Sequence, residues 1–146
     1  MIDDPKAKPS EVKRVLLCTG KIYYDLLEKQ QTDKRSDVAI VRVEQLYPTP
    51  YEQIETIRSK YKKAKSFIWV QEEPENMGAW PYLCRKFRNS DLQVISRKES
   101  SSTATGYTKE HIAQQLSIIG KAFEDEAGKN TKKSIEKATK KVVNID

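Results

Sequence analysis

Two adjacent glutamates, Glu72 and Glu73, are the side chains of this sequence that most readily suggest chemistry. They follow a short apolar run, residues 67–70, whose length and composition are typical of a fully buried strand. In open α/β sheets, ligand and partner sites lie at the carboxyl ends of strands. Two carboxylates there could act as a general acid and base, but successive residues of an extended chain point to opposite sides. We therefore favour a charge contact between these glutamates and a lysine or arginine of another segment or domain.

The turn at residues 19–21, Thr-Gly-Lys, lies between a predicted strand and a predicted helix and superficially resembles a phosphate-binding turn. It lacks both complete glycine-rich phosphate-binding patterns, so a tight turn is the simpler explanation of Gly20. Lys21 stands near a helix N-terminus, where the helix dipole disfavours positive charge. That position suggests that Lys21 reaches the anion of a partner.

Recognisable catalytic and metal motifs are missing from the sequence. The single histidine, His111, falls in the first turn of the last predicted helix and has no cysteine or serine at a recognisable spacing. Cys18 and Cys84 lie in apolar surroundings without a C-x-x-C spacing, as expected of buried free thiols in a reducing compartment. We therefore expect this chain to contribute no catalytic, metal-binding or cofactor-binding residue.

Apolar runs and amphipathic patterns alternate along the chain, and they would position these residues. Strands are expected at residues 14–18, 38–43, 67–70 and 92–96, each followed by apolar residues at helical spacing. The order β-α-β-α-β-α-β-α predicts an α/β fold of three layers, with helices on both faces of a mostly parallel, doubly wound sheet. The weakest strand, residues 92–96, is expected at an edge, where it could be antiparallel.

The helical patterns also predict caps and buried faces. We expect Thr49 to cap the second helix and Thr108 the fourth, and Trp80 of the third helix to be largely buried against the sheet. A hydrophobic staple is expected between Tyr107 and Ile112. The buried face of the fourth helix is expected to consist of apolar residues at i, i+4, i+7 and i+11, which are Ile112, Leu116, Ile119 and Phe123.

The composition fits one soluble domain. The chain has 146 residues, 33% of them charged, and a formal net charge of +6. We expect a linker over residues 1–12, an α/β domain over residues 13–123, and a lysine-rich tail over residues 124–146 that is a frayed helix or disordered alone. No stretch approaches the roughly 18 apolar residues of a membrane span, and the start of the sequence has no signal-peptide pattern. We therefore expect a soluble intracellular protein without membrane contact.

Basic clusters keep a second class of function open. Lysine and arginine gather at residues 58–65, at residues 85–88 and in the tail. Such runs usually form solvated helix faces, but a free-standing module that binds nucleic acid or another polyanion is the alternative. A steep loss of nucleic-acid binding with salt would support this alternative, and no binding at low salt would eliminate it.

Three blocks of sequence carry a family resemblance. They are residues 15–27 (VLLCTGKIYYDLL), residues 37–48 (DVAIVRVEQLYP), and residues 71–74 (QEEP) with Asn76 and residues 78–80 (GAW). Together and in this order they resemble the C-terminal domain of the thiamine diphosphate-dependent 2-oxoglutarate dehydrogenase component, over about residues 12–123. A more distant likeness is to the C-terminal domain of transketolase, whose three-layer fold is the one expected here.

The resemblance implies a part of an oxidoreductase of the tricarboxylic acid cycle. That enzyme oxidatively decarboxylates 2-oxoglutarate and transfers the succinyl group to the lipoyl-bearing succinyltransferase component. Family members are homodimers whose thiamine diphosphate and magnesium are held by two preceding domains. The resemblance thus implies a structural and dimerisation domain that is inactive alone, located in a bacterial cytoplasm or a mitochondrial matrix.

The resemblance also implies contacts with the remaining domains of the enzyme. In some relatives acyl-CoA or nucleotide effectors bind where this domain meets its neighbours. The candidates for effector binding at predicted strand ends are Lys21, Arg42 and Arg97, and those for interdomain contact are Glu72 and Glu73. The tail over residues 124–146 extends past the usual end of the family, and its role is open between docking and solubility.

Overall fold

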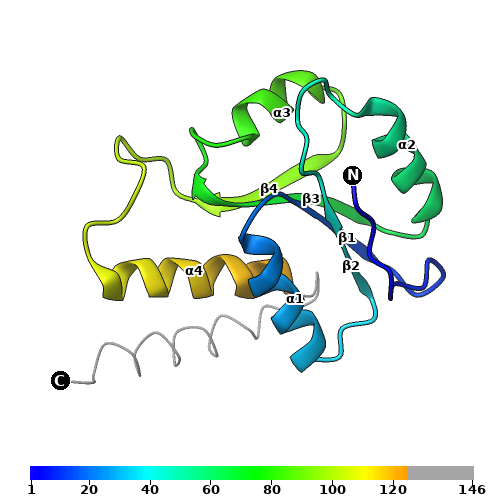
Figure 1. The fold of residues 1–146 in the computed structure, drawn as a ribbon, viewed down its shortest axis with the longest axis horizontal. Helices are drawn as coiled ribbons and strands as arrows, with labels where there is room; N and C mark the ends of the chain where they lie inside the picture. The colour runs from blue at the N-terminus through cyan, green and yellow to red at the C-terminus, as the bar shows by residue number, and fades with distance from the viewer. Residues whose placement is uncertain (125–146) are drawn as a thin grey trace.

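The computed structural model describes residues 1–124, so the tail expected over residues 124–146 lies, apart from its first residue, outside the described residues. Within this part, strands and helices alternate (Figure 1). In chain order they are β1 (Arg14–Cys18), α1 (Ile22–Thr32), β2 (Val38–Arg42), α2 (Tyr51–Lys60), β3 (Ser66–Pro74), α3 (Trp80–Lys86), β4 (Leu92–Arg97) and α4 (Thr108–Ala122). The predicted order of elements is confirmed, and β3 runs further than predicted, through both glutamates to Pro74.

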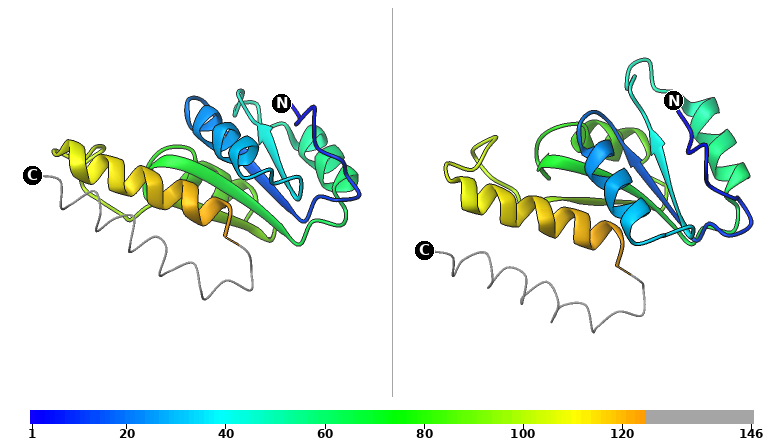
Figure 2. Two further views of the ribbon diagram at one scale, coloured as in Figure 1. Left: turned by 90° about the horizontal axis from the view of Figure 1, so that it is seen from below. Right: turned by 60° about the horizontal axis from the view of Figure 1, so that its bottom comes forward.

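The strands form one parallel sheet in the order β2-β1-β3-β4. Helices α1 and α4 cover one face, and α2 and α3 cover the other, as Figure 1 shows and the views of Figure 2 confirm. Each face has its own core, because successive strand residues point to opposite sides. Leu17 and Trp69 pack towards α2 and α3, whereas Leu16 and Ile68 pack towards α1 and α4. This is the three-layer, doubly wound α/β fold that the sequence predicts.

The edge strand β4 is parallel to β3, so the possibility of an antiparallel edge is wrong. Helix α3 and its flanking turns supply the long crossover that a parallel neighbour requires. The pairing between the two strands shifts register between Val70 and Pro74. The shift falls at the glutamates, so the acidic corner is also the point where the regular ladder is interrupted.

The first twelve residues, expected as a linker, are anchored on the other edge of the sheet. Ile2 forms an antiparallel bridge with Arg42 of β2. The buried carboxylate of Asp4 accepts hydrogen bonds from the backbone N–H of Ile40, at 3.2 Å, and from the side chain of Gln30, at 2.9 Å. This segment therefore satisfies backbone groups on the outer side of β2 that would otherwise face solvent.

Helix α4 buries only part of the face that was predicted. Ile112 is 43% and Leu116 49% exposed, so these two positions and the staple with the exposed Tyr107 are wrong, whereas Phe123 is buried as predicted. Gln115 is half-buried and Ile118 and Ala122 are buried, and these three residues stand one position before Leu116, Ile119 and Phe123. A shift of one residue turns an α-helix by roughly 100°.

Two arginines hold the C-terminal end of α4 in this orientation. The guanidinium of Arg14 donates to the carbonyl oxygen of Ala122 at 2.9 Å, and that of Arg35 donates to the carbonyl oxygen of Phe123 at 2.6 Å. Both carbonyls belong to the helix end that has no partner within the helix. The two contacts fix which face of α4 meets the sheet.

The short helix α3 and the start of α2 also correct the sequence predictions. Trp80 is only half-buried and Cys84 is exposed, because Leu83 is the one side chain of α3 that enters the core. Cys18 is buried as predicted, and burial raises the pKa of its thiol to about 12. Thr49 does not cap α2, which begins one residue later than expected, and its hydroxyl instead hydrogen-bonds that of Tyr82.

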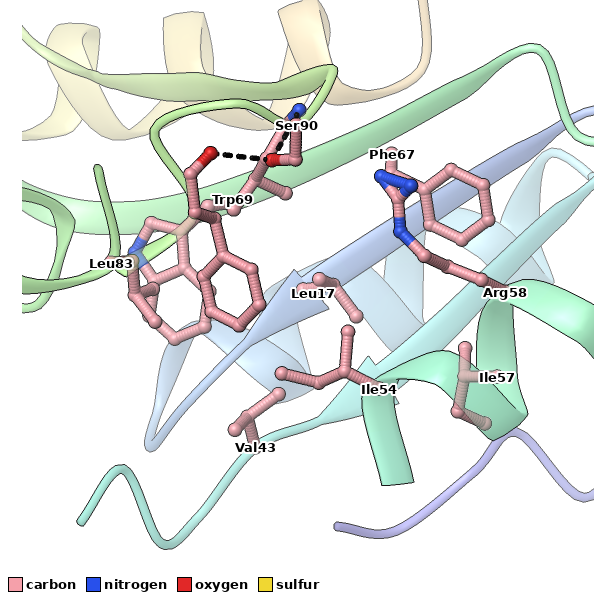
Figure 3. A pocket seen from close by; sticks show the side chains of 11 residues that line it. Leu17, Val43, Ile54, Ile57, Arg58, Phe67, Trp69, Leu83 and Ser90 are labelled. Atoms are coloured by element: carbon pink, nitrogen blue, oxygen red, sulfur yellow. Dashed lines mark hydrogen bonds between the residues drawn. The ribbon is translucent and has the colours of Figure 1, made fainter. Parts of the chain in front are cut away.

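A small cavity of about 20 Å³ lies between α2, α3 and the sheet (Figure 3). Its walls are almost wholly apolar side chains, among them Leu17, Ile54 and Leu83. A void of this size holds at most about one water molecule, and apolar voids stay dry. We assign it to core packing and not to a ligand.

Candidate functional site

The acidic corner after β3 is organised by one buried side chain, Gln71. Its amide nitrogen donates to the carbonyl oxygens of Pro74, at 3.0 Å, and Met77, at 2.8 Å. Its amide oxygen accepts from the indole nitrogen of Trp69, at 2.9 Å, and from the backbone N–H of Trp80, at 3.0 Å. One side chain therefore joins the core, the end of the strand and the start of α3.

Gly78 closes the same corner with a backbone angle φ of +65°, in the left-handed region that favours glycine. A Cβ at this position would lie 3.1 Å from Cβ of Glu73 and 3.2 Å from the amide oxygen of Gln71. Gly20 has a similar φ of +71°, but no atom lies within 4 Å of the corresponding position. A comparison of the two glycines therefore distinguishes the cost of the left-handed backbone, which both positions share, from the cost of crowding, which only Gly78 has.

We expect Gly78→Ala to destabilise the fold by more than Gly20→Ala. The left-handed conformation costs a non-glycine residue about 1–2 kcal/mol, and both variants incur this cost. Only Gly78→Ala must also displace Gln71 or Glu73, which adds roughly 1 kcal/mol. Urea unfolding of both variants measures the difference, and equal midpoints would contradict the close packing of the corner.

Glu72 and Glu73 do not form a carboxylate pair, because they leave the strand on opposite faces. The Glu72 carboxylate accepts from Lys21, at 3.1 Å, and from the amide of Gln115, at 2.8 Å. Glu73 lies on the side of Gly78 and is exposed. Within residues 1–124, no side-chain hydrogen bond or ion pair reaches the Glu73 carboxylate.

Lys21 is the centre of a polar cluster between α1, β3 and α4. Its ammonium lies 3.1 Å from the Glu72 carboxylate and 3.6 Å from that of Asp25, and Gln115 donates to both carboxylates at 2.8 Å. The hydrogen bond and charge of Glu72 raise the pKa of Lys21. The anion suggested by the position of Lys21 is therefore present within the chain itself.

Arg42, at the end of β2, is also paired within the chain. Its guanidinium donates to Glu44 at 2.7 Å and lies 4.5 Å from the centre of the Tyr23 ring. The hydrogen bond from Arg42 lowers the pKa of Glu44. Glu44 also accepts from the backbone N–H of Gly20 at 3.4 Å, so Arg42 and the turn that carries Lys21 share one edge of the sheet.

Arg97, at the end of β4, lies apart from these two groups. Its guanidinium contacts the Nδ1 atom of His111 at 3.0 Å. It lines a cavity of about 570 Å³ between the end of β4, the loop that follows it and α4. The structure therefore brings Lys21 together with Glu72, places Arg42 beside them, and gives Arg97 separate surroundings.

Sequence reasoning missed Gln71, Gln115, Asp25 and Glu44 as parts of this site. One signal was available for Gln71, because the alternation of β3 places it on the same buried face as Trp69, and buried polar groups are almost always hydrogen-bonded. The other three acquire their roles from contacts between elements, which no spacing in the sequence reveals.

Two negative findings concern the described part of the chain. Among residues 1–124, no three histidine, cysteine, aspartate or glutamate side chains gather closely enough to hold a metal ion. No helix in that part has the length and apolar character to cross a membrane.

Comparison with known proteins gives the family. The model of the family described as "2-oxoglutarate dehydrogenase C-terminal" matches residues 1–123. The "2-oxoglutarate dehydrogenase E1 component" of Haemophilus influenzae is 40% identical over 120 residues, which cover 79% of this chain and 13% of the relative. The protein of the same name from Azotobacter vinelandii is 41% identical over 123 residues, with the same two shares.

A third relative is the "2-oxoglutarate dehydrogenase E1/E2 component" of Corynebacterium glutamicum, which is 38% identical over 130 residues, covering 85% of this chain and 11% of the relative. The chain thus spans only about an eighth of the length of these relatives. The family model nevertheless matches residues 1–123, which are all but one of the described residues. The chain belongs to the 2-oxoglutarate dehydrogenase C-terminal family.

Proposed function

We propose that the chain forms the C-terminal α/β domain of a 2-oxoglutarate dehydrogenase, which oxidatively decarboxylates 2-oxoglutarate and passes the succinyl group to a lipoyl group. The observation that carries this proposal is the family match over residues 1–123. Thiamine diphosphate and magnesium are then bound by other domains of the enzyme. This chain supplies structure and contacts, and the lipoyl-bearing succinyltransferase component is a partner of the whole enzyme.

The carboxyl edge of the sheet is the proposed surface for contact with the other domains and within a homodimer. Glu73 is exposed there, and Glu72 lies beside it within the Lys21 cluster. Two tyrosines close to this edge are also strongly exposed, Tyr24 at 60% and Tyr47 at 80%. Tyrosine is enriched in protein interfaces, because it combines a large apolar ring with a polar group.

A chimeric enzyme tests this function. Residues 1–123 replace the matching stretch of the Azotobacter vinelandii relative, and decarboxylation of 2-oxoglutarate is measured with thiamine diphosphate and magnesium. We expect the chimera to be active and dimeric, and the isolated chain to give no turnover. Glu73→Lys in the chimera is expected to lower activity and dimer content by roughly tenfold, as for reversal of a charge in a contact.

The matched control is Glu75→Lys, which reverses an exposed charge two residues away and is expected to leave the chimera active. Turnover by the isolated chain would contradict the placement of catalysis on other domains. A folded, dimeric chimera without turnover would contradict the assignment to this enzyme.

Effector binding is the second part of the proposal, with acyl-CoA or nucleotide as the ligand class. Of the three candidates, Lys21 and Arg42 already have carboxylate partners, in Glu72 and Glu44. Arg97 instead contacts the Nδ1 atom of His111 and lines a cavity. The geometry therefore favours Arg97 as the residue that meets an anionic effector.

The alternative, a free-standing module that binds nucleic acid, loses part of its support. Arg58 pairs with Asp91 and lies 4.8 Å from the centre of the Phe67 ring, and Lys60 pairs with Asp3. Two charges of the cluster over residues 58–65 are thus used within the fold. The salt titration described above still discriminates between the two functions.

A further inference from the structure

The outer side of α4 carries apolar side chains that nothing within residues 1–124 covers. Ile112 and Leu116 are exposed and Ile119 is half-buried, and none of the three belongs to the core between α1, α4 and the sheet. Their spacing of four and then three residues puts them on one side of the helix. An apolar stripe on a helix surface normally packs against another element.

The same three residues line an open groove between α4 and α1, the two helices that cover one face of the sheet (Figure 2). The volume of the groove is about 520 Å³. Its other wall is α1, which contributes polar residues that include Asp25 and Glu28. A groove with one apolar wall and one polar wall is suited to an amphipathic helix, which buries its apolar side and keeps its charged side in solvent.

The charge that this groove offers to a partner is negative. Its two lysines are already paired, Lys21 with Glu72 at 3.1 Å and Lys29 with Asp33 at 2.8 Å. Glu28 is exposed, and among the residues that the structure describes no hydrogen bond or ion pair reaches its carboxylate. Charge complementarity therefore favours a basic partner.

The segment that follows α4 in the chain has both properties. Residues 125–146 lie outside the described residues, and their sequence contains Ile135, Ala138 and Val142. These residues are three and then four positions apart, so a helix brings them to one side. The segment also carries six lysines, which are Lys129, Lys132, Lys133, Lys137, Lys140 and Lys141. A helix of this length is marginal alone in water and needs a surface on which to pack.

The two apolar stripes match when the segment runs back along α4. The spacing in α4 is four and then three residues, and the spacing in the segment is three and then four. An antiparallel arrangement therefore brings all three positions into register. The resulting pairs are Ile112 with Val142, Leu116 with Ala138, and Ile119 with Ile135. Residues 124–130, which include Gly128, remain for the reversal, and this is a usual length for a connection between antiparallel helices.

We propose that the groove between α1 and α4 is the docking site of residues 131–143 of the same chain, which lie antiparallel to α4 as an amphipathic helix. The apolar side of this helix covers the stripe of α4, and its lysines stand towards Glu28. The short connection gives the segment a high effective concentration at the groove, so a modest contact is sufficient. The inference goes beyond the proposed function, which rests on residues 1–123.

Disulfide formation in the full chain tests this arrangement. Ile112→Cys is combined with Val142→Cys in a Cys84→Ser background, which removes the exposed native thiol. The matched control combines Ile112→Cys with Asn144→Cys, a position two residues further along the chain and on the opposite side of the helix. We expect the first pair to form an intramolecular disulfide at least roughly tenfold faster under mild oxidation, because docking holds its thiols together. Non-reducing electrophoresis measures both rates.

Amide chemical shifts of residues 112–119 give a second measurement, with substitutions that leave the groove itself unaltered. Ile135→Asp is expected to shift these amides, whereas Asn144→Asp, on the opposite side of the helix, should not. Equal rates for the two cysteine pairs, or shifts that Ile135→Asp leaves unchanged, would overturn the proposal. Disulfide-linked dimers in place of the intramolecular bond would also overturn it, because they would assign the groove to a second copy of the chain.

Discussion

The Gln71→Leu variant is expected to lose about 3–5 kcal/mol of unfolding free energy. Leucine fills a similar volume, but it removes the partners of Trp69, Trp80, Pro74 and Met77 at once. Each buried polar group left without a partner costs about 1–3 kcal/mol, although groups near solvent recover part of this. For a chain of this length, the melting temperature should fall by roughly 10 °C.

The control for this variant is Gln93→Leu, in the neighbouring strand β4. Gln93 is exposed, so its replacement is expected to change the unfolding free energy by less than about 0.5 kcal/mol. Thermal and urea unfolding followed by circular dichroism measure both variants. A Gln71→Leu midpoint equal to that of the control would show that the corner does not depend on this amide.

The two tryptophans should differ sharply when each is truncated. Trp69 is 1% exposed at the centre of the core under α2 and α3, and Trp69→Ala is expected to cost about 3–5 kcal/mol. Trp80 is half-buried at the start of α3, so Trp80→Ala should cost only about 1–2 kcal/mol. The sequence alone predicted that Trp80 is largely buried, and the half-buried position corrects that prediction.

The fluorescence of the two single-tryptophan variants reports the same contrast. The emission of Trp69, isolated in a Trp80→Phe background, should lie at shorter wavelength than that of Trp80 isolated by Trp69→Phe. Equal unfolding costs for the two alanine variants, or equal emission maxima, would contradict the assignment of Trp69 to the core.

The sheet could be predicted from the sequence because parallel strands buried on both faces read as continuous apolar runs. Residues 14–18 and 38–43 are such runs, and β1 and β2 lie there. The direction of β4 could not be predicted in this way, since its burial is only partial and its partner is defined by the crossover through α3.

Helix α4 shows why the phase of an amphipathic helix can be misread. Its sequence carries two candidate stripes one residue apart, and the one with more apolar residues faces outwards at Ile112 and Leu116. One position earlier stand the exposed His111 and the half-buried Gln115, whose polar side chains contact Arg97 and Glu72 at the ends of β4 and β3. A helix that crosses charged strand ends must be polar there, and hydrophobic spacing alone does not include this requirement.

The position of the candidate site could be predicted from the sequence, whereas the partners of its charged side chains could not. The expectation that cations and carboxylates gather where strands end follows from the fold class. The partner of Lys21 depends on how α1 and α4 flank β3, and that of Arg42 on the local bend that returns Glu44 towards Gly20. The loop beside Arg97 carried no motif, and only its closed shape reveals a cavity.

The anchoring of the first residues on β2 has a consequence for how the molecule behaves among its copies. A bare outer strand offers unpaired amide and carbonyl groups to any extended chain that it meets. Here Ile2 and the carboxylate of Asp4 occupy such groups on Arg42 and Ile40. We therefore expect the N-terminal segment to prevent strand addition and self-association along that edge of the sheet.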